Sequence, residues 1–175
     1  SSIARTINIF FENPTTAFSL LEISRKTNLA HTSTKTNLTK LFNTGLVKRH
    51  VEIKGRRKFP TYTANRNRKE FVQEKMIANF SSIFNSGLLS HLEETISPKS
   101  IVLFGSYRRG EDIETSDIDL FIESKNEEVN LKLFEKKLKR KIQLHWNHDF
   151  KQYPDELKNN IINGIVMHGF LEGYP

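Results

Sequence analysis

Two aspartates separated by a single residue, Asp117 and Asp119, carry the clearest chemical signal in this 175-residue chain. Alternate side chains of a β-strand share one face, so in a strand both carboxylates point to the same side while Ile118 points into the core. Two carboxylates this close repel each other, and a divalent cation is the usual means of keeping both ionised. The pair therefore predicts a divalent-metal site at the start of a strand.

A glycine–serine pair, Gly105-Ser106, precedes the aspartates and follows an apolar run over residues 100–104 that suits a buried strand. Glycine allows backbone N–H groups to approach a phosphate closely, and Ser106 adds a hydroxyl donor. Arg108 and Arg109 come next, and their guanidinium groups suit phosphate oxygens, although surface arginines are often simply solvated. A phosphate-binding turn beside a metal site indicates chemistry on a nucleoside triphosphate.

This arrangement resembles the DNA polymerase beta superfamily of nucleotidyltransferases. The shared features are a strand, Gly-Ser, a polar loop and the sequence Ser-Asp-Ile-Asp-Leu at residues 116–120. The chain is most similar to the minimal, archaeal-type members, which occur alone, as toxin–antitoxin partners or fused to winged helices. The resemblance covers about residues 87–170 and implies an α/β (α+β) domain with a mixed sheet and helices on one face.

The resemblance also implies roles for the residues of the motif. Asp117 and Asp119 would be the catalytic pair and would ligate Mg²⁺, which bridges the phosphates of the nucleotide. Four residues would bind the nucleotide, the first two of them holding the triphosphate tail: Gly105, Ser106, Arg108 and Arg109.

The family normally supplies a third carboxylate from a later strand, and this chain departs from that pattern. We expect a helix over residues 127–140 and then a strand over residues 141–146, in which Gln143 takes the place of the acid. Glutamine cannot accept a proton at neutral pH and is a poorer metal ligand than a carboxylate. Three outcomes stay open: substrate-assisted transfer with two aspartates, an acid supplied from elsewhere, or nucleotide binding without turnover.

His145 lies two residues beyond Gln143 and shares its strand face, so it is a candidate base. A lone strand histidine is more often structural, and we favour that role. His145, His148 and Asp149 can also be interpreted as a transition-metal cluster, but a strand end does not give these ligands the geometry that helical spacing gives. Magnesium at the aspartates is the better prediction.

The C-terminal segment resembles that of the archaeal minimal members over residues 160–169. We expect a helix beginning near Pro154 that covers the sheet rather than doing chemistry. Its expected buried stripe is Leu157, Ile161, Ile162, Ile165 and Val166.

The positive charge of the chain is concentrated in its first half. Residues 1–99 carry 16 Lys and Arg against 7 Asp and Glu, whereas residues 100–175 carry 11 against 13. The first half also has the order helix, helix, turn, helix and basic hairpin, which is typical of a winged helix-turn-helix. We therefore expect a DNA-binding module, with docking or dimerisation as the alternative for the same shape.

The predicted DNA contacts lie on two elements of this module. The candidate recognition helix spans about residues 32–43, and Gly55 suits the tip of the hairpin between residues 46 and 64. Short polar side chains and lysines are suited to bases and phosphates. The expected contacts are Thr32, Ser33, Thr34, Lys35, Asn37 and Lys40 on the helix, and Lys54, Arg56, Arg57 and Lys58 on the hairpin.

These features divide the chain into a winged helix (residues 1–65), a connecting helix (66–86) and a nucleotidyltransferase domain (87–175). The connecting helix either joins the modules or pairs with a second chain in a homodimer. Without cysteine, an apolar run of about 18 residues or a signal-peptide block, the chain is expected to be cytoplasmic, with no membrane partner.

The predicted function is Mg²⁺-dependent transfer of a nucleoside monophosphate from a nucleoside triphosphate, taken as ATP, to a hydroxyl acceptor, by an enzyme that also binds DNA. The alternative is a DNA-binding transcriptional regulator, or an antitoxin-like protein with a protein partner, whose nucleotidyltransferase domain binds nucleotide without efficient turnover. Gln143 favours this alternative.

Overall fold

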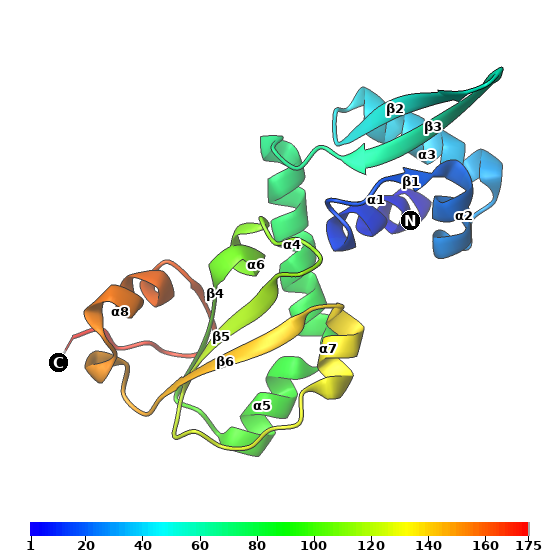
Figure 1. Ribbon diagram of the computed structural model, residues 1–175. Coiled ribbons are helices and arrows are strands. Elements are labelled where there is room, and N and C mark those ends of the chain that lie inside the picture. The colour runs from blue at the N-terminus through cyan, green and yellow to red at the C-terminus, as the bar shows by residue number, and fades with distance from the viewer. Residues whose placement is uncertain (175) are drawn as a thin grey trace. The chain divides into compact units, whose positions relative to one another are not determined.

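The computed structural model describes residues 1–174, which form two compact units (Figure 1). The first unit is Ser1–Ala78 and the second begins at Asn79, so the division falls within the helix α4 (Lys69–Ser86). Within residues 1–174, none of the helices combines the length and the apolar character that a membrane span requires.

The first unit combines helices with a three-stranded antiparallel sheet. Its strands are arranged in the order β1-β3-β2, so the strand that comes last in the sequence lies in the centre of the sheet. Before α4 the elements are α1 (Ser2–Glu12), β1 (Phe18–Ser19), α2 (Leu20–Thr27), α3 (His31–Asn43), β2 (Val47–Lys54) and β3 (Arg57–Ala64).

One side chain from each helix of the first unit meets in its core. Phe10, Ile23, Leu38 and Phe71, from α1, α2, α3 and α4, are completely or almost completely buried. Such side chains each stabilise the fold by about 1.5–3 kcal/mol relative to exposure. The buried residues of α3 recur at helical spacing, so one face of this helix packs against the other helices and the opposite face is exposed to solvent.

Gly45 follows the end of α3 and turns the chain. Its φ of +78° is left-handed, its N–H donates to the carbonyl of Phe42, and the N–H of Leu46 reaches back to Leu41. This pair of bonds satisfies carbonyls at the helix end that would otherwise lack partners. The chain is thereby turned from α3 directly into β2.

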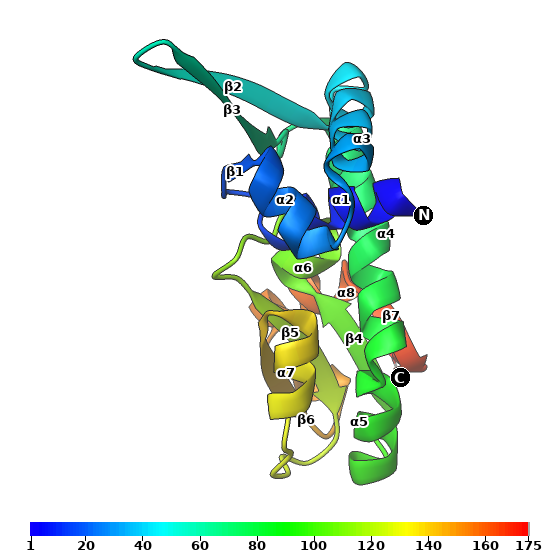
Figure 2. The ribbon, with the colours of Figure 1, turned by 90° about the vertical axis from the view of Figure 1, so that its right-hand side faces the viewer.

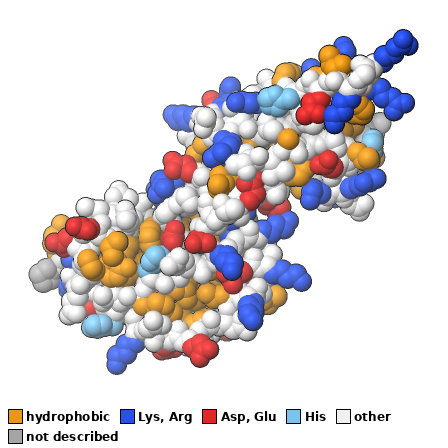
Figure 3. All heavy atoms as spheres, viewed as in Figure 1, with side chains coloured by type: hydrophobic (Ala, Val, Ile, Leu, Met, Phe, Trp, Pro, Cys, Tyr) orange, Lys and Arg blue, Asp and Glu red, His pale blue; other side chains and the backbone are white. Residues whose placement is uncertain are grey.

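The hairpin of β2 and β3 extends away from the helices of its unit (Figure 2). Lys54 pairs with Arg57 across the tip, and Gly55 there has a φ of +63°. Every residue of β2 after Val47 is exposed. Figure 3 shows Lys and Arg side chains gathered around this hairpin.

The second unit is built on a four-stranded mixed sheet, which confirms the predicted α/β class. Its strand order is β6-β5-β4-β7, with β5 and β6 parallel and the other pairs antiparallel. After α4 the elements are α5 (Leu88–Ile96), β4 (Ser100–Phe104), α6 (Gly105–Arg109), β5 (Asp117–Glu123), α7 (Lys132–Leu138), β6 (Lys141–Asn147), the 3₁₀ helix η1 (Phe150–Gln152), α8 (Asp155–Ile162) and β7 (Ile165–Gly169).

Helices pack on both faces of this sheet, not on one face as expected. On the first face the end of α4, α5 and α7 cover an apolar cluster that includes Ile118 and Leu120 of β5. On the second face, Phe150 of η1 and Ile161 of α8 pack with Phe121. Asp117 and Asp119 alternate along β5 with Ile118 and Leu120, so their side chains lie on the second face of the sheet, the face that α8 covers.

Two predicted helices differ in the structure. The helix expected over residues 127–140 is limited to α7, because the backbone N–H of Lys132 donates to the side chain of Asn130, a local bond that competes with helix formation before this point. Residues 165–169 form the strand β7 rather than continuing α8. Of the expected buried stripe, only Ile161 is fully buried. Leu157 and Ile162 are exposed on α8. Ile165 and Val166 belong to β7, where successive side chains point to opposite faces of the sheet.

Candidate functional site

Gly105 lies where β4 ends and α6 begins, directly beside Asp119 of the neighbouring strand. Phe104 is the register partner of Asp119 in the antiparallel pair of β4 and β5. Gly105 has a φ of +79°, and a Cβ on it would lie 2.5 Å from Oδ2 of Asp119. Only glycine therefore lets the backbone and this carboxylate approach each other.

One cleft brings together all four residues predicted to bind nucleotide. It has a volume of about 710 Å³ and is lined by Gly105, Ser106, Arg108, Arg109 and Asp119. The Nε atom of Arg108 is buried and, among the described residues, has no hydrogen-bond partner. A buried cationic N–H without a partner is costly, and a bound anion close to the guanidinium lowers that cost.

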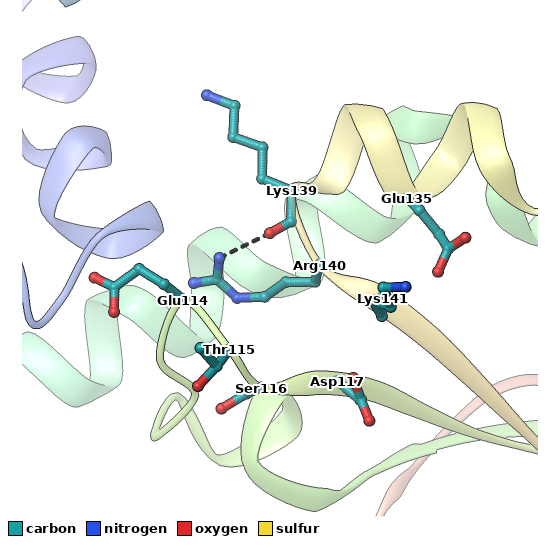
Figure 4. Close-up of a pocket in the computed structure, with 8 residues that line it drawn as sticks. All are labelled: Glu114, Thr115, Ser116, Asp117, Glu135, Lys139, Arg140 and Lys141. Carbon is teal, nitrogen blue, oxygen red and sulfur yellow. Dashed lines mark hydrogen bonds between the residues drawn. The ribbon is translucent and has the colours of Figure 1, made fainter.

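Asp117 lines a neighbouring hollow of about 520 Å³ rather than this cleft. Figure 4 shows the loop at residues 114–116 and Asp117 along one side of it, and the turn from α7 into β6 along the other. The two aspartates thus share a strand face but border two adjacent depressions. Each carboxylate is partly exposed.

His145, not Gln143, makes the contact with Asp119. Gln143 is the register partner of Asp119 in the parallel pair of β5 and β6, and it is exposed. His145 Nε2 lies 3.0 Å from Asp119 Oδ1, and its ring centroid lies 4.9 Å from that of Phe104. The sequence analysis noted that His145 shares a strand face with Gln143 but did not predict its contact with Asp119.

The donor set is suited to Mg²⁺. Among residues 1–174 there is no group of three or more His, Cys, Asp or Glu side chains arranged to hold a metal ion. Magnesium commonly binds through one or two carboxylates, with phosphates and waters completing its octahedron. Asp117 and Asp119 therefore fit a cation that arrives with a triphosphate.

A buried ion pair holds the loop between the glycine–serine turn and β5. Arg140 Nε lies 3.1 Å from Asp112 Oδ2, and both side chains are almost fully buried. Asn79 donates to the other oxygen of Asp112 at 2.8 Å. Ser116 Oγ accepts the N–H of Ile113, which closes the loop just before Asp117. The sequence analysis missed this clamp, because residues far apart in the chain form it.

The basic residues predicted on the hairpin are all exposed. Lys54, Arg56, Arg57 and Lys58 surround its tip. Most of the polar residues predicted on α3 are exposed as well, namely Thr32, Ser33, Lys35 and Lys40.

Thr34 and Asn37 are corrections to the predicted DNA contacts. Both are buried: Thr34 Oγ1 donates to the carbonyl of Ala30, and Asn37 Nδ2 donates to Thr6 Oγ1 of α1. They lie on the face of α3 that packs against the core, together with Leu38, so they hold the helix in place and are not available to a ligand.

Comparisons with known proteins agree with this geometry. Residues 86–167 match the family described as Nucleotidyltransferase domain. A Methanocaldococcus jannaschii protein named as a protein adenylyltransferase is 52% identical over 44 residues, which are 25% of this chain and 51% of that relative. The aligned segment thus spans about half the length of the relative. No solved structure matches the chain significantly. These matches support a nucleotidyltransferase domain in the second unit.

Proposed function

We propose that this protein is a Mg²⁺-dependent nucleotidyltransferase that transfers AMP from ATP to a hydroxyl group of an acceptor. The observation that carries the proposal is the close approach of Gly105 to Asp119 in a cleft that also holds Ser106 and two arginines. The family match over residues 86–167 supports nucleotidyl transfer, and the name of the relative supports ATP as the donor.

In this proposal the chain binds and orients the triphosphate. Backbone N–H groups at Gly105 and the hydroxyl of Ser106 hold its phosphates, and Arg108 or Arg109 compensates the charge of the leaving pyrophosphate. Asp117 and Asp119 would hold Mg²⁺, which would stabilise charge on the phosphates during an in-line displacement.

The transfer itself exchanges one phosphorus–oxygen bond for another. The acceptor oxygen bonds to the α-phosphorus while the bond from that phosphorus to the α,β-bridging oxygen breaks, and pyrophosphate leaves. Because Gln143 cannot take the hydroxyl proton, a non-bridging phosphate oxygen of the substrate accepts it. This assigns the chain a positioning and electrostatic role, with substrate-assisted proton transfer.

The position of the label in ATP tests this proposal. With Mg²⁺ and a broad panel of protein, nucleic-acid and small-molecule acceptors, label from α-³²P-ATP should enter an acceptor and label from γ-³²P-ATP should not. Asp117→Asn and Asp119→Asn should each lower transfer about 100-fold or more, while the exposed Asp155→Asn should not. Transfer of the γ-label, or normal rates in both aspartate variants, would contradict the proposal.

We further propose that residues 1–65 are a winged helix-turn-helix that binds DNA, joined by residues 66–86 to the nucleotidyltransferase domain at 87–175. The order of helices and the antiparallel sheet in the first unit support this assignment. The four exposed cations at the hairpin tip supply the charge that contacts with phosphates require.

A second candidate function is nucleotide binding without efficient turnover, in a DNA-binding regulator or an antitoxin-like protein. Two observations favour it: Gln143 stands beside Asp119 in place of an acid, and Asp119 is already bound to His145. Calorimetry that detects ATP binding, together with no transfer across the acceptor panel, would favour this function over the first.

A further inference from the structure

The helix α8 supplies a third wall of the nucleotide cleft, and its residues have no role in the mechanism above. Three asparagines line the cleft from this helix and its end: Asn159, Asn160 and Asn163. Asn163 follows Asn160 by three residues and Asn159 by four, about one helical turn, and all three line the same cleft. Ile161, which is 1% exposed, packs on the second face of the sheet and fixes the rotation of α8.

The amide groups are available for a ligand. Asn163 Nδ2 donates to the carbonyl of Asn159 at 2.7 Å, which leaves the side-chain oxygen of Asn163 as an acceptor. Asn159 and Asn160 are exposed, and within residues 1–174 their side chains make no hydrogen bond to the protein. Each therefore offers both a donor and an acceptor.

The cleft thus has two chemically different halves. The half formed by α6 and β5 carries two arginines and Asp119, and it suits phosphates and a cation. The half formed by α8 has only uncharged amides, and Phe104 lines the same cleft. Ribose hydroxyls and a nucleobase edge need neutral donors and acceptors, and a volume of about 710 Å³ is typical of a small-molecule site.

We propose that Asn159 and Asn160, with the side-chain oxygen of Asn163, bind the nucleoside half of the substrate and select adenine over guanine. This inference rests on the proposed function. An amide matches the N7 acceptor and N6 donor of adenine with two hydrogen bonds, whereas guanine presents two acceptors at that edge, which an arginine matches better. The α8 wall is therefore the specificity-determining part of the cleft, and α6 and β5 form its reactive part.

The test compares ligands that share the phosphates and differ in the nucleoside. Full-length protein with Mg²⁺ is titrated calorimetrically with α,β-methylene-ATP, with α,β-methylene-GTP and with inorganic tripolyphosphate. The variant is Asn159→Ala combined with Asn160→Ala, which removes two exposed side chains and no protein hydrogen bond that involves them. Asn85→Ala, an exposed asparagine on α4, is the matched control.

The double variant should bind the adenine nucleotide about tenfold more weakly, lose the preference over the guanine nucleotide, and bind tripolyphosphate as the wild type does. Asn85→Ala should change none of the three affinities. Unchanged binding of the adenine nucleotide by the double variant would overturn the inference and leave the proposed function standing. An equal loss of affinity for tripolyphosphate in the double variant would also overturn the inference, because it would mean that α8 binds the phosphates. No binding of any nucleotide by the wild type would overturn both.

Discussion

Gly105 is the residue at which backbone conformation and site chemistry meet. Its left-handed φ is strained for any other residue, and its Cα faces the carboxylate of Asp119. A side chain here would have to displace the proposed metal ligand. Glycine is therefore required for the site as well as for the turn.

Gly105→Ala should abolish transfer and lower the free energy of unfolding more than Gly87→Ala does. Gly87 has a φ of +82°, but a Cβ there would meet only Phe134 at 3.9 Å, so it reports strain alone, about 1–2 kcal/mol. Steric conflict with Asp119 should add about 1–3 kcal/mol. The free energy of unfolding of both variants is measured by denaturant unfolding followed by the fluorescence of the single tryptophan, Trp146, because this residue lies in the second unit. Equal losses in the two variants would refute the steric argument.

Gln143 stands at the position for which the family resemblance implies a third carboxylate. It is exposed on β6 beside Asp119, so an acid can be placed there without disturbing the core. Gln143→Glu should raise the rate of AMP transfer about 10- to 100-fold, because a general base typically contributes at least that much. Gln143→Ala, the control, should leave the rate near that of the wild type. A lower rate in Gln143→Ala would mean that the amide itself takes part in catalysis.

At the scale of elements, the buried pair of Asp112 and Arg140 ties the loop before β5 to the start of β6. Both strands carry residues of the site on the second face of the sheet, so the pair positions them relative to each other. Removing one partner leaves an uncompensated buried charge, which is far more costly than losing a surface pair.

Asp112→Ala should lower the free energy of unfolding of the second unit by about 3–5 kcal/mol. Glu111→Gln breaks the exposed pair with Arg109 in the same loop and should cost less than about 1 kcal/mol. Combining Asp112→Ala with Arg140→Met should recover part of the loss, since no buried charge is left alone. Denaturant unfolding monitored at Trp146 provides the comparison, and a loss below about 1 kcal/mol for Asp112→Ala would contradict this role.

Local patterns predicted the elements that define the site, and long-range contacts account for what they missed. The strands β4 and β5 and the glycine–serine turn between them follow from apolar runs and turn residues. The clamp of Asp112 and Arg140 joins residues 28 positions apart in the chain, which no local spacing signals. The start of the helix expected over residues 127–140 depended on one side-chain bond at Asn130.

At the scale of the whole molecule, the proposed contact with DNA depends on the positive charge of the first half. The excess of Lys and Arg before residue 100 includes the exposed cations of the hairpin. Residue type alone overestimated the set of residues accessible for the proposed DNA contact, since Thr34 and Asn37 are polar but buried in the core. Burial, which depends on how α3 packs, was needed to separate the two groups.

Binding of a random-sequence DNA duplex by the full chain should weaken steeply between 50 and 200 mM salt. Arg56→Ala with Arg57→Ala should reduce the slope of log affinity against log salt by about 2, because two phosphate contacts are lost. Lys132→Ala with Lys136→Ala removes the same charge from exposed positions on α7 and should leave the slope unchanged. Fluorescence anisotropy measures the slopes, and equal effects of the two pairs would refute a hairpin-directed contact.

The structure of the full chain bound to Mg²⁺ and α,β-methylene-ATP tests the central claim most directly. We predict Mg²⁺ about 2.1 Å from carboxylate oxygens of both Asp117 and Asp119 and from a phosphate oxygen, with the triphosphate against Gly105 and Ser106. A nucleotide bound away from this turn, or a metal ion held by neither aspartate, would contradict the account.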